Sequence, residues 1–263
     1  MSSSAIRQTT AQRIESVFRT ERGQPSAKLR LYCLHHAGGS SALFHGWGKV
    51  LPPSIEARYV VFPGREARFA EPAASSVEAL VEQLAPQLEL DIDRPFAMLG
   101  HSFGGLVAFE LAHALRNRGL PEPEHLFVSA ARAPHVWPGW NRLDRMPFEQ
   151  LLDELRRFGG TPKAVLDDHE LMREFVPMIR ADFRAVATYR YTPRRVLGCP
   201  ITALQGSDDA IVPSDAISAW ETHTRGAFEL HEFSGDHFFI KTSMDRVVDT
   251  ITKSLDRLVD ASV

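Results

Sequence analysis

The stretch PFAMLGHSFGGLVAFELAHAL, residues 95–115, joins an apolar segment to a helical pattern with almost no loop between them. The five residues at the join, Gly100 to Gly104, match the pattern G-x-S-x-G with Ser102 at its centre. Glycines leave room for a sharp strand-to-helix turn, and such a turn lifts the serine hydroxyl above the end of a sheet. The stretch predicts a nucleophilic serine at a strand–helix corner, and the alternative role of Ser102 is that of a helix N-cap.

Short apolar segments alternate with amphipathic helical patterns along the rest of the chain. The segments predicted as strands are residues 30–35, 58–62, 95–100, 125–130, 200–206 and 228–233. Continuous apolar strands separated by helices are typical of a parallel sheet that is covered on both faces. We therefore expect an α/β fold with a mostly parallel central sheet and helices on both of its faces.

One connection is much longer than the loops that usually join elements in such a fold. No strand is predicted from Arg132 to Cys199, although residues 147–159 and 168–191 carry apolar side chains at helical spacing. We expect the second of these helical stretches to break at Pro177. Residues 133–195 are therefore predicted to be a helical insertion that forms a lid over one edge of the sheet, and the alternative is additional core.

Composition limits the class of protein. The net charge of −3 argues against a nucleic-acid-binding protein, which needs a basic surface. No apolar run is long enough to cross a bilayer, and the first 27 residues lack the hydrophobic centre of a signal peptide. Two cysteines are too few for a disulfide framework or a four-cysteine zinc site. We expect a cytoplasmic monomer with a flexible arm at 1–27 and one domain at 28–263.

A serine nucleophile needs a base, and the base needs an orienting acid. In a fold with this strand–helix corner the three follow in the order serine, acid, histidine, each after a later strand. Asp208 and Asp209 follow the predicted strand that ends at Gly206. We expect Asp209 to be the acid, although either aspartate could instead form the turn or cap a helix. His237 follows the last predicted strand, at the place that this order assigns to the base.

An acyl-transfer site also needs N–H donors for the oxyanion of the tetrahedral intermediate. The residue after the nucleophile, Phe103, would supply one donor. The loop HHAGGSS, residues 35–41, follows the first predicted strand, and we assign the second donor to Ala37, with Gly38 as the alternative. The adjacent histidines of this loop do not converge on one ion, so no metal site is predicted. Acyl transfer by a serine, a histidine and an acid requires no redox cofactor, so none is predicted.

Six motifs in order, spanning roughly residues 30 to 240, carry a resemblance to a known family. They are LHHAGGSS, FPGREAR, GHSFGG, IRADFRAVATYRY, ITALQGSDD and SGDHFFI. With these motifs the chain resembles the type II thioesterases, stand-alone α/β-hydrolases that accompany polyketide synthases and nonribosomal peptide synthetases. The resemblance implies an α/β-hydrolase fold and hydrolysis of acyl groups from the phosphopantetheine arm of acyl or peptidyl carrier proteins, which clears stalled or aberrant chains.

The resemblance also bears on the acid. Thioesterase domains fused to the end of synthases carry the acid after the strand that follows the nucleophile helix. Here that stretch is FVSAARAP, residues 127–134, which contains no acid. An acid in GSDD fits the stand-alone type.

Several interpretations stay open from the sequence alone. A carboxylesterase or lipase would use the same triad, and a noncatalytic scaffold of this fold could bind an acyl ligand or a partner protein. Arg65, Glu66 and Arg68 of FPGREAR either shape the mouth of the site or form a solvated turn with an ion pair. The aromatic residues of the insertion that could line an acyl channel are Trp137, Trp140, Phe183, Tyr189 and Tyr191.

Overall fold

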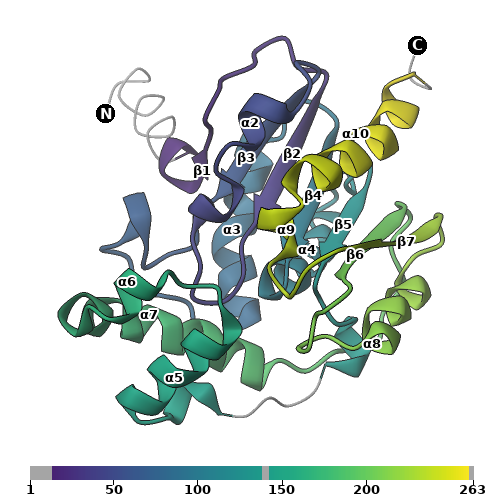
Figure 1. The fold of residues 1–263 in the computed structure, drawn as a ribbon. Helices are drawn as coiled ribbons and strands as arrows, with labels where there is room; N and C mark the ends of the chain where they lie inside the picture. The colour runs from purple at the N-terminus through teal and green to yellow at the C-terminus, as the bar shows by residue number, and fades with distance from the viewer. Residues whose placement is uncertain (1–13, 138–141, 261–263) are drawn as a thin grey trace, which may run out of the picture.

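The computed structural model describes residues 14–137 and 142–260 of the protein. Its centre is a seven-stranded sheet with the strand order β1-β3-β2-β4-β5-β6-β7 (Figure 1). Every neighbouring pair is parallel except β1 with β3. The strands are β1 (Phe18–Arg19), β2 (Leu29–Leu34), β3 (Ile55–Val60), β4 (Phe96–His101), β5 (Leu126–Ser129), β6 (Ile201–Gly206) and β7 (Phe228–Phe233). The fold class predicted from the sequence is confirmed.

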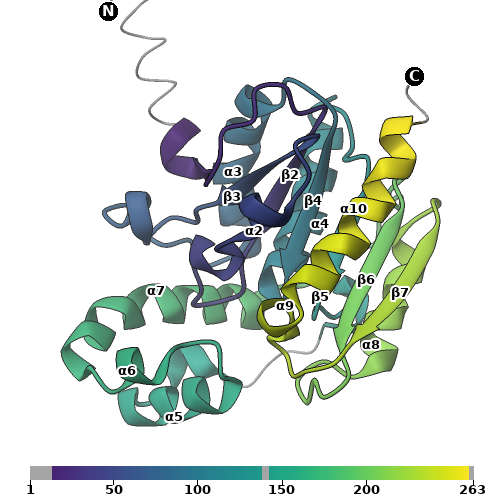
Figure 2. The same cartoon turned by 45° about the horizontal axis from the view of Figure 1, so that its top comes forward.

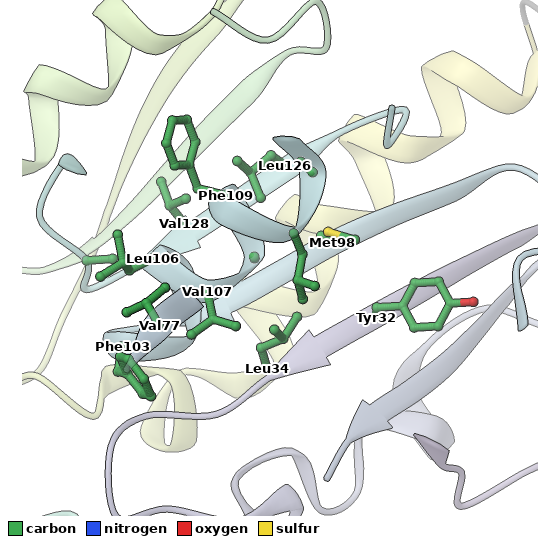
Figure 3. Packing of buried hydrophobic residues seen from close by; sticks show 14 of the residues in the cluster. Tyr32, Leu34, Val77, Met98, Phe103, Leu106, Val107, Phe109, Leu126 and Val128 are labelled. Carbon is green, nitrogen blue, oxygen red and sulfur yellow. The ribbon is translucent and has the colours of Figure 1, made fainter. Parts of the chain in front are cut away.

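Helices cover both faces of the sheet, and this explains why β2, β4, β5 and β6 are buried along their whole length. In β2, Tyr32 and Leu34 pack with α3 and α4 on one face, whereas Leu31 and Cys33 pack with α10 on the other. Figure 3 shows the first of these apolar layers from close by. The covering helices are α2 (Trp47–Val50), α3 (Val77–Asp91), α4 (Phe103–Asn117), α8 (Ser214–Ser218), α9 (Phe239–Thr242) and α10 (Met244–Asp260).

Between β5 and β6 the described residues form helices and contain no strand of the sheet. The helical insertion consists of α5 (Phe148–Phe158), α6 (Lys163–Leu166) and α7 (His169–Thr188), which lie together at one end of the sheet (Figure 2). These helices share an apolar core of their own. The expected break at Pro177 is wrong, because α7 is continuous through it. Packing of neighbouring Val176 and Ile179 into that core offsets the hydrogen bond that proline removes.

The sheet also begins earlier than the sequence suggested. Phe18 pairs with Val60 and Arg19 with Tyr59, so β1 adds an antiparallel edge strand to β3. Val17 and Phe18 are each only 2% exposed. The prediction that 1–27 lies outside the domain is therefore wrong for the segment around β1, while residues 1–13 lie outside the described residues. Within the described parts of the chain, no helix is long and apolar enough to cross a membrane.

Candidate active site

Ser102 occupies a strained corner between β4 and α4. Its backbone has φ 54° and ψ −118°, a region that residues with a side chain rarely adopt. The corner is possible because a Cβ on Gly100 would lie 2.1 Å from the carbonyl oxygen of Gly104, and a Cβ on Gly104 would lie 2.2 Å from that of Leu34. The glycines of G-x-S-x-G therefore allow the close approach of β2, β4 and α4 that presents Ser102.

His237 and Asp209 form a hydrogen-bonded pair on the loops that follow β7 and β6. The His237 Nδ1 atom lies 2.8 Å from Oδ2 of Asp209, and the Asp209 side chain is fully enclosed. The other carboxylate oxygen, Oδ1, accepts hydrogen bonds from the N–H groups of Ile211 at 2.8 Å and Val212 at 3.0 Å. An ionised carboxylate only accepts, so Nδ1 donates to it and Nε2 of His237 carries the free lone pair.

The surroundings of Asp209 favour its charged form. Burial opposes ionisation, but the hydrogen bond and charge of His237 and the two backbone N–H groups outweigh it and lower the pKa of Asp209 below its usual value. Asp208, the alternative acid, is exposed and accepts a hydrogen bond from the Ser207 hydroxyl at 3.1 Å. The structure therefore brings Asp209, and not Asp208, to His237.

The two predicted oxyanion donors lie beside Ser102. Ala37, Phe103 and Ser102 line one hollow together. Phe103 is the first residue of α4, where the backbone N–H has no partner within the helix, and among the described residues nothing accepts the N–H of Ala37. The alternative donor, Gly38, already gives its N–H to Oδ2 of Asp182 at 2.7 Å. This arrangement favours Ala37.

A pocket lies between the loops that carry Ala37, Ser102 and His237 and the helical insertion. Ser102 and His237 line it from the sheet, while Leu155, Phe158 and Phe183 line it from α5 and α7. Of the other aromatic residues predicted to line an acyl channel, Trp137 borders the hollow at Ala37, and the Tyr189 hydroxyl is held by Glu110 at 2.7 Å. Trp140 lies outside the described residues.

Two further histidines, which the sequence did not assign to the site, pack around His237. The ring centroid of His101 lies 5.3 Å from that of His237, and His36 contacts Phe238 edge-on at 4.8 Å. Burial, together with the positive charge of Lys241 nearby, lowers the pKa of His36 to about 3. Burial also lowers the pKa of His101. Both rings are therefore neutral at pH 7, and no group of three or more potential metal ligands occurs in the described chain.

A serine on a strand–helix corner of a parallel sheet, with an acid–histidine pair on later loops, defines the class of α/β-hydrolases. The thioesterase domain family matches residues 29–255. The gramicidin S biosynthesis protein GrsT of Aneurinibacillus migulanus is 39% identical over 234 residues, covering 89% of this chain and 91% of that protein. Thioesterase PikA5 of Streptomyces venezuelae is 39% identical over 234 residues, covering 88% and 82%.

Solved structures agree with the sequence comparisons. The structure of the type II thioesterase BorB from the borrelidin biosynthetic cluster matches with a TM-score of 0.83 and 38% identity, covering 90% of this chain and 97% of that one. The chain belongs to the thioesterase family and is a type II thioesterase of the α/β-hydrolase fold. The family resemblance inferred from the six motifs is confirmed.

Proposed function

We propose that this thioesterase hydrolyses acyl groups from the phosphopantetheine arm of acyl or peptidyl carrier proteins and so removes stalled or aberrant chains from polyketide or nonribosomal peptide synthesis. Its relatives support this proposal: GrsT is a gramicidin S biosynthesis protein, and BorB is a type II thioesterase from the borrelidin biosynthetic cluster. All proposed catalytic groups come from one chain, which is consistent with a monomer.

The observation that carries the proposal is the Asp209–His237 pair beside Ser102. His237 and Ser102 line the same cavity, and Asp209 fixes the imidazole with Nδ1 protonated. We assign Ser102 as the nucleophile, His237 as the general base and acid, and Asp209 as the orienting carboxylate. The N–H groups of Phe103 and Ala37 are assigned to the oxyanion.

Hydrolysis then proceeds in two steps through an acyl-serine. Nε2 of His237 takes the hydroxyl proton while Ser102 Oγ attacks the thioester carbonyl. The tetrahedral intermediate then collapses, the C–S bond breaks, and the pantetheine sulfur leaves as a thiol with the proton that His237 held. Water, deprotonated by His237, attacks the acyl-serine; the ester bond breaks, the carboxylic acid leaves, and His237 returns the proton to Ser102 Oγ. The apolar side chains of Leu155, Phe158 and Phe183 offer a surface that the acyl chain can cover.

The test compares the same acyl chain on a carrier protein and as a simple oxygen ester, with native protein and Ser102→Ala. We expect native protein to deacylate the carrier and Ser102→Ala to be slower by at least about a thousandfold. Cleavage of the ester with no release from the carrier would refute the carrier-protein substrate. Undiminished deacylation by Ser102→Ala would refute the assignment of the nucleophile.

A further inference from the structure

A buried ion pair links the helical insertion to the body of the protein beside the proposed oxyanion hole. Arg65, on the loop after β3, donates to Asp182 of α7 through both terminal nitrogens, at 2.8 Å from Nη1 to Oδ2 and 2.8 Å from Nη2 to Oδ1. The two side chains are only 4% and 3% exposed. A bidentate pair of this kind fixes orientation as well as distance.

The pair also holds the loop that carries Ala37. Oδ2 of Asp182 accepts the N–H of Gly38 at 2.7 Å, and Nη1 of Arg65 donates to the carbonyl oxygen of Gly39 at 2.9 Å. Gly38 has φ 71°, and a Cβ on it would lie 3.4 Å from Ile179, one turn before Asp182 on α7. Helix α7 therefore contacts this loop through a hydrogen bond and through an apolar side chain.

The residue after Arg65 provides a second attachment to the same loop. Glu66 accepts hydrogen bonds from the backbone N–H of Ser41 at 2.7 Å and from its hydroxyl at 2.6 Å. Glu66 adopts φ 50°, which is unusual for a residue with a side chain. Through Arg65 and Glu66, the motif FPGREAR therefore forms hydrogen bonds that hold residues 38–41 in place, and it is not a solvated turn.

We propose that Arg65 and Asp182 are positioning residues for the oxyanion hole, so that alignment of the Ala37 N–H depends on α7 being docked. Gly38, which Asp182 holds, is the residue next to Ala37. Oxyanion stabilisation requires a donor within about 2.7–3.1 Å of the developing charge, so a small shift of this loop weakens it. The inference rests on the proposed function of Ser102 and Ala37.

The test measures hydrolysis of an acyl-N-acetylcysteamine thioester by Asp182→Ala and Asp182→Asn. Asparagine keeps an oxygen for Gly38 but loses the charge that Arg65 requires. We expect kcat to fall about 10- to 100-fold in Asp182→Ala and less in Asp182→Asn, because losing a whole oxyanion donor costs about 100- to 1000-fold. KM should change by less than about threefold, because both oxygens of the Asp182 carboxylate accept hydrogen bonds from Gly38 and Arg65.

Two controls separate positioning from general destabilisation. Glu56→Gln removes a buried carboxylate that pairs with Arg30 at 2.9 Å near the opposite ends of the strands, and it should leave kcat unchanged. Affinity for an acyl trifluoromethyl ketone, which forms an oxyanion on the serine, should fall in parallel with kcat in the Asp182 variants. Arg65→Lys combined with Asp182→Asn should be clearly non-additive.

The outcomes distinguish this inference from the proposed function. Unchanged kcat in both Asp182 variants, a kcat loss matched by Glu56→Gln, or a change in KM alone would overturn the positioning role while leaving the proposed function intact. Full activity of Ser102→Ala in the same assay would instead overturn the proposed function, on which the positioning role depends.

Discussion

His237 and Asp209 meet because the loops after β6 and β7 approach each other at a glycine. Their side chains lie 2.8 Å apart, and a Cβ on Gly206 would lie only 2.4 Å from the carbonyl oxygen of Asp236. The backbone N–H of Asp208 joins the same two loops by donating to Gly235 at 2.9 Å. Asp208 thus contributes its backbone to the structure, while Asp209 contributes its carboxylate to His237.

We expect the two aspartates to differ sharply when each is changed to asparagine. Asp209→Asn removes the charge that fixes the His237 tautomer and should lower kcat by about 1000- to 10,000-fold. Asp208→Asn alters an exposed side chain and should stay within about twofold of native protein. Steady-state hydrolysis of an acyl thioester measures both, and equal, mild losses would contradict the assignment of the acid.

Alanine substitutions at Gly104 and Gly119 test the close packing of the corner at Ser102, because only Gly104 is surrounded by backbone atoms. In Gly104→Ala the new methyl group meets the backbone of Leu34, so unfolding free energy should fall by about 3 kcal/mol or more. Gly119 has φ 75° but open space around it, so Gly119→Ala should cost about 1 kcal/mol and leave activity intact. Urea denaturation measures both variants. A Gly104→Ala protein with the stability of native protein would contradict the close contact between Gly104 and the backbone of Leu34.

Stability should fall as pH falls below about 6.5. Burial lowers the pKa of His125 to about 4 in the folded protein, whereas the unfolded chain keeps an ordinary histidine pKa. The unfolded state therefore binds more protons as the pH decreases, which favours unfolding. His125 should contribute about 2 kcal/mol to the loss between pH 7 and pH 5.

The variant His125→Gln, which can still reach the Thr202 hydroxyl that His125 contacts at 2.8 Å, isolates this effect. Urea denaturation at both pH values should show a smaller loss for the variant than for native protein. Identical losses in the two proteins would mean that folding does not lower the pKa of His125.

The apolar wall of the cavity should set the length of acyl chain that is accepted. Leu155 is 5% exposed and lines the cavity, so Leu155→Trp shortens the space in front of Ser102. We expect kcat/KM for a dodecanoyl thioester to fall at least about tenfold, with an acetyl thioester changed by less than about threefold. Leu171→Trp, at a 38% exposed position on α7, is the matched control and should leave both unchanged. Equal effects of the two variants would place the acyl chain elsewhere.

Much of the fold could be predicted because its signals are local. The strands from β2 to β6 are short segments rich in apolar residues, and β7 alternates apolar with polar residues. G-x-S-x-G between a strand and a helix is a local requirement of the corner. Strand β1 was missed because two residues cannot show a period, and its place depends on pairing with β3. Likewise, Pro177 does not end α7, because tertiary packing outweighs local preference.

The site likewise contains residues that the sequence can predict and residues that only the structure reveals. Ser102, the acid and His237 follow strands in a fixed order, so the order points to Ser102, to Asp208 or Asp209, and to His237. The contact with His237 distinguishes Asp209 from Asp208. The Arg65–Asp182 pair joins residues 117 positions apart, and no short pattern relates them. The sequence therefore left Arg65 between two interpretations, and only the three-dimensional contacts show that it reaches α7 and the loop of Gly39.

The central claim is that Ser102 removes acyl groups from a carrier protein, and intact-mass spectrometry of an acylated carrier tests it most directly. After incubation with native protein, the carrier should lose the mass of the acyl group and keep its phosphopantetheine arm. With Ser102→Ala the acylated mass should persist. Loss of the acyl group at the same rate with both proteins would contradict the account.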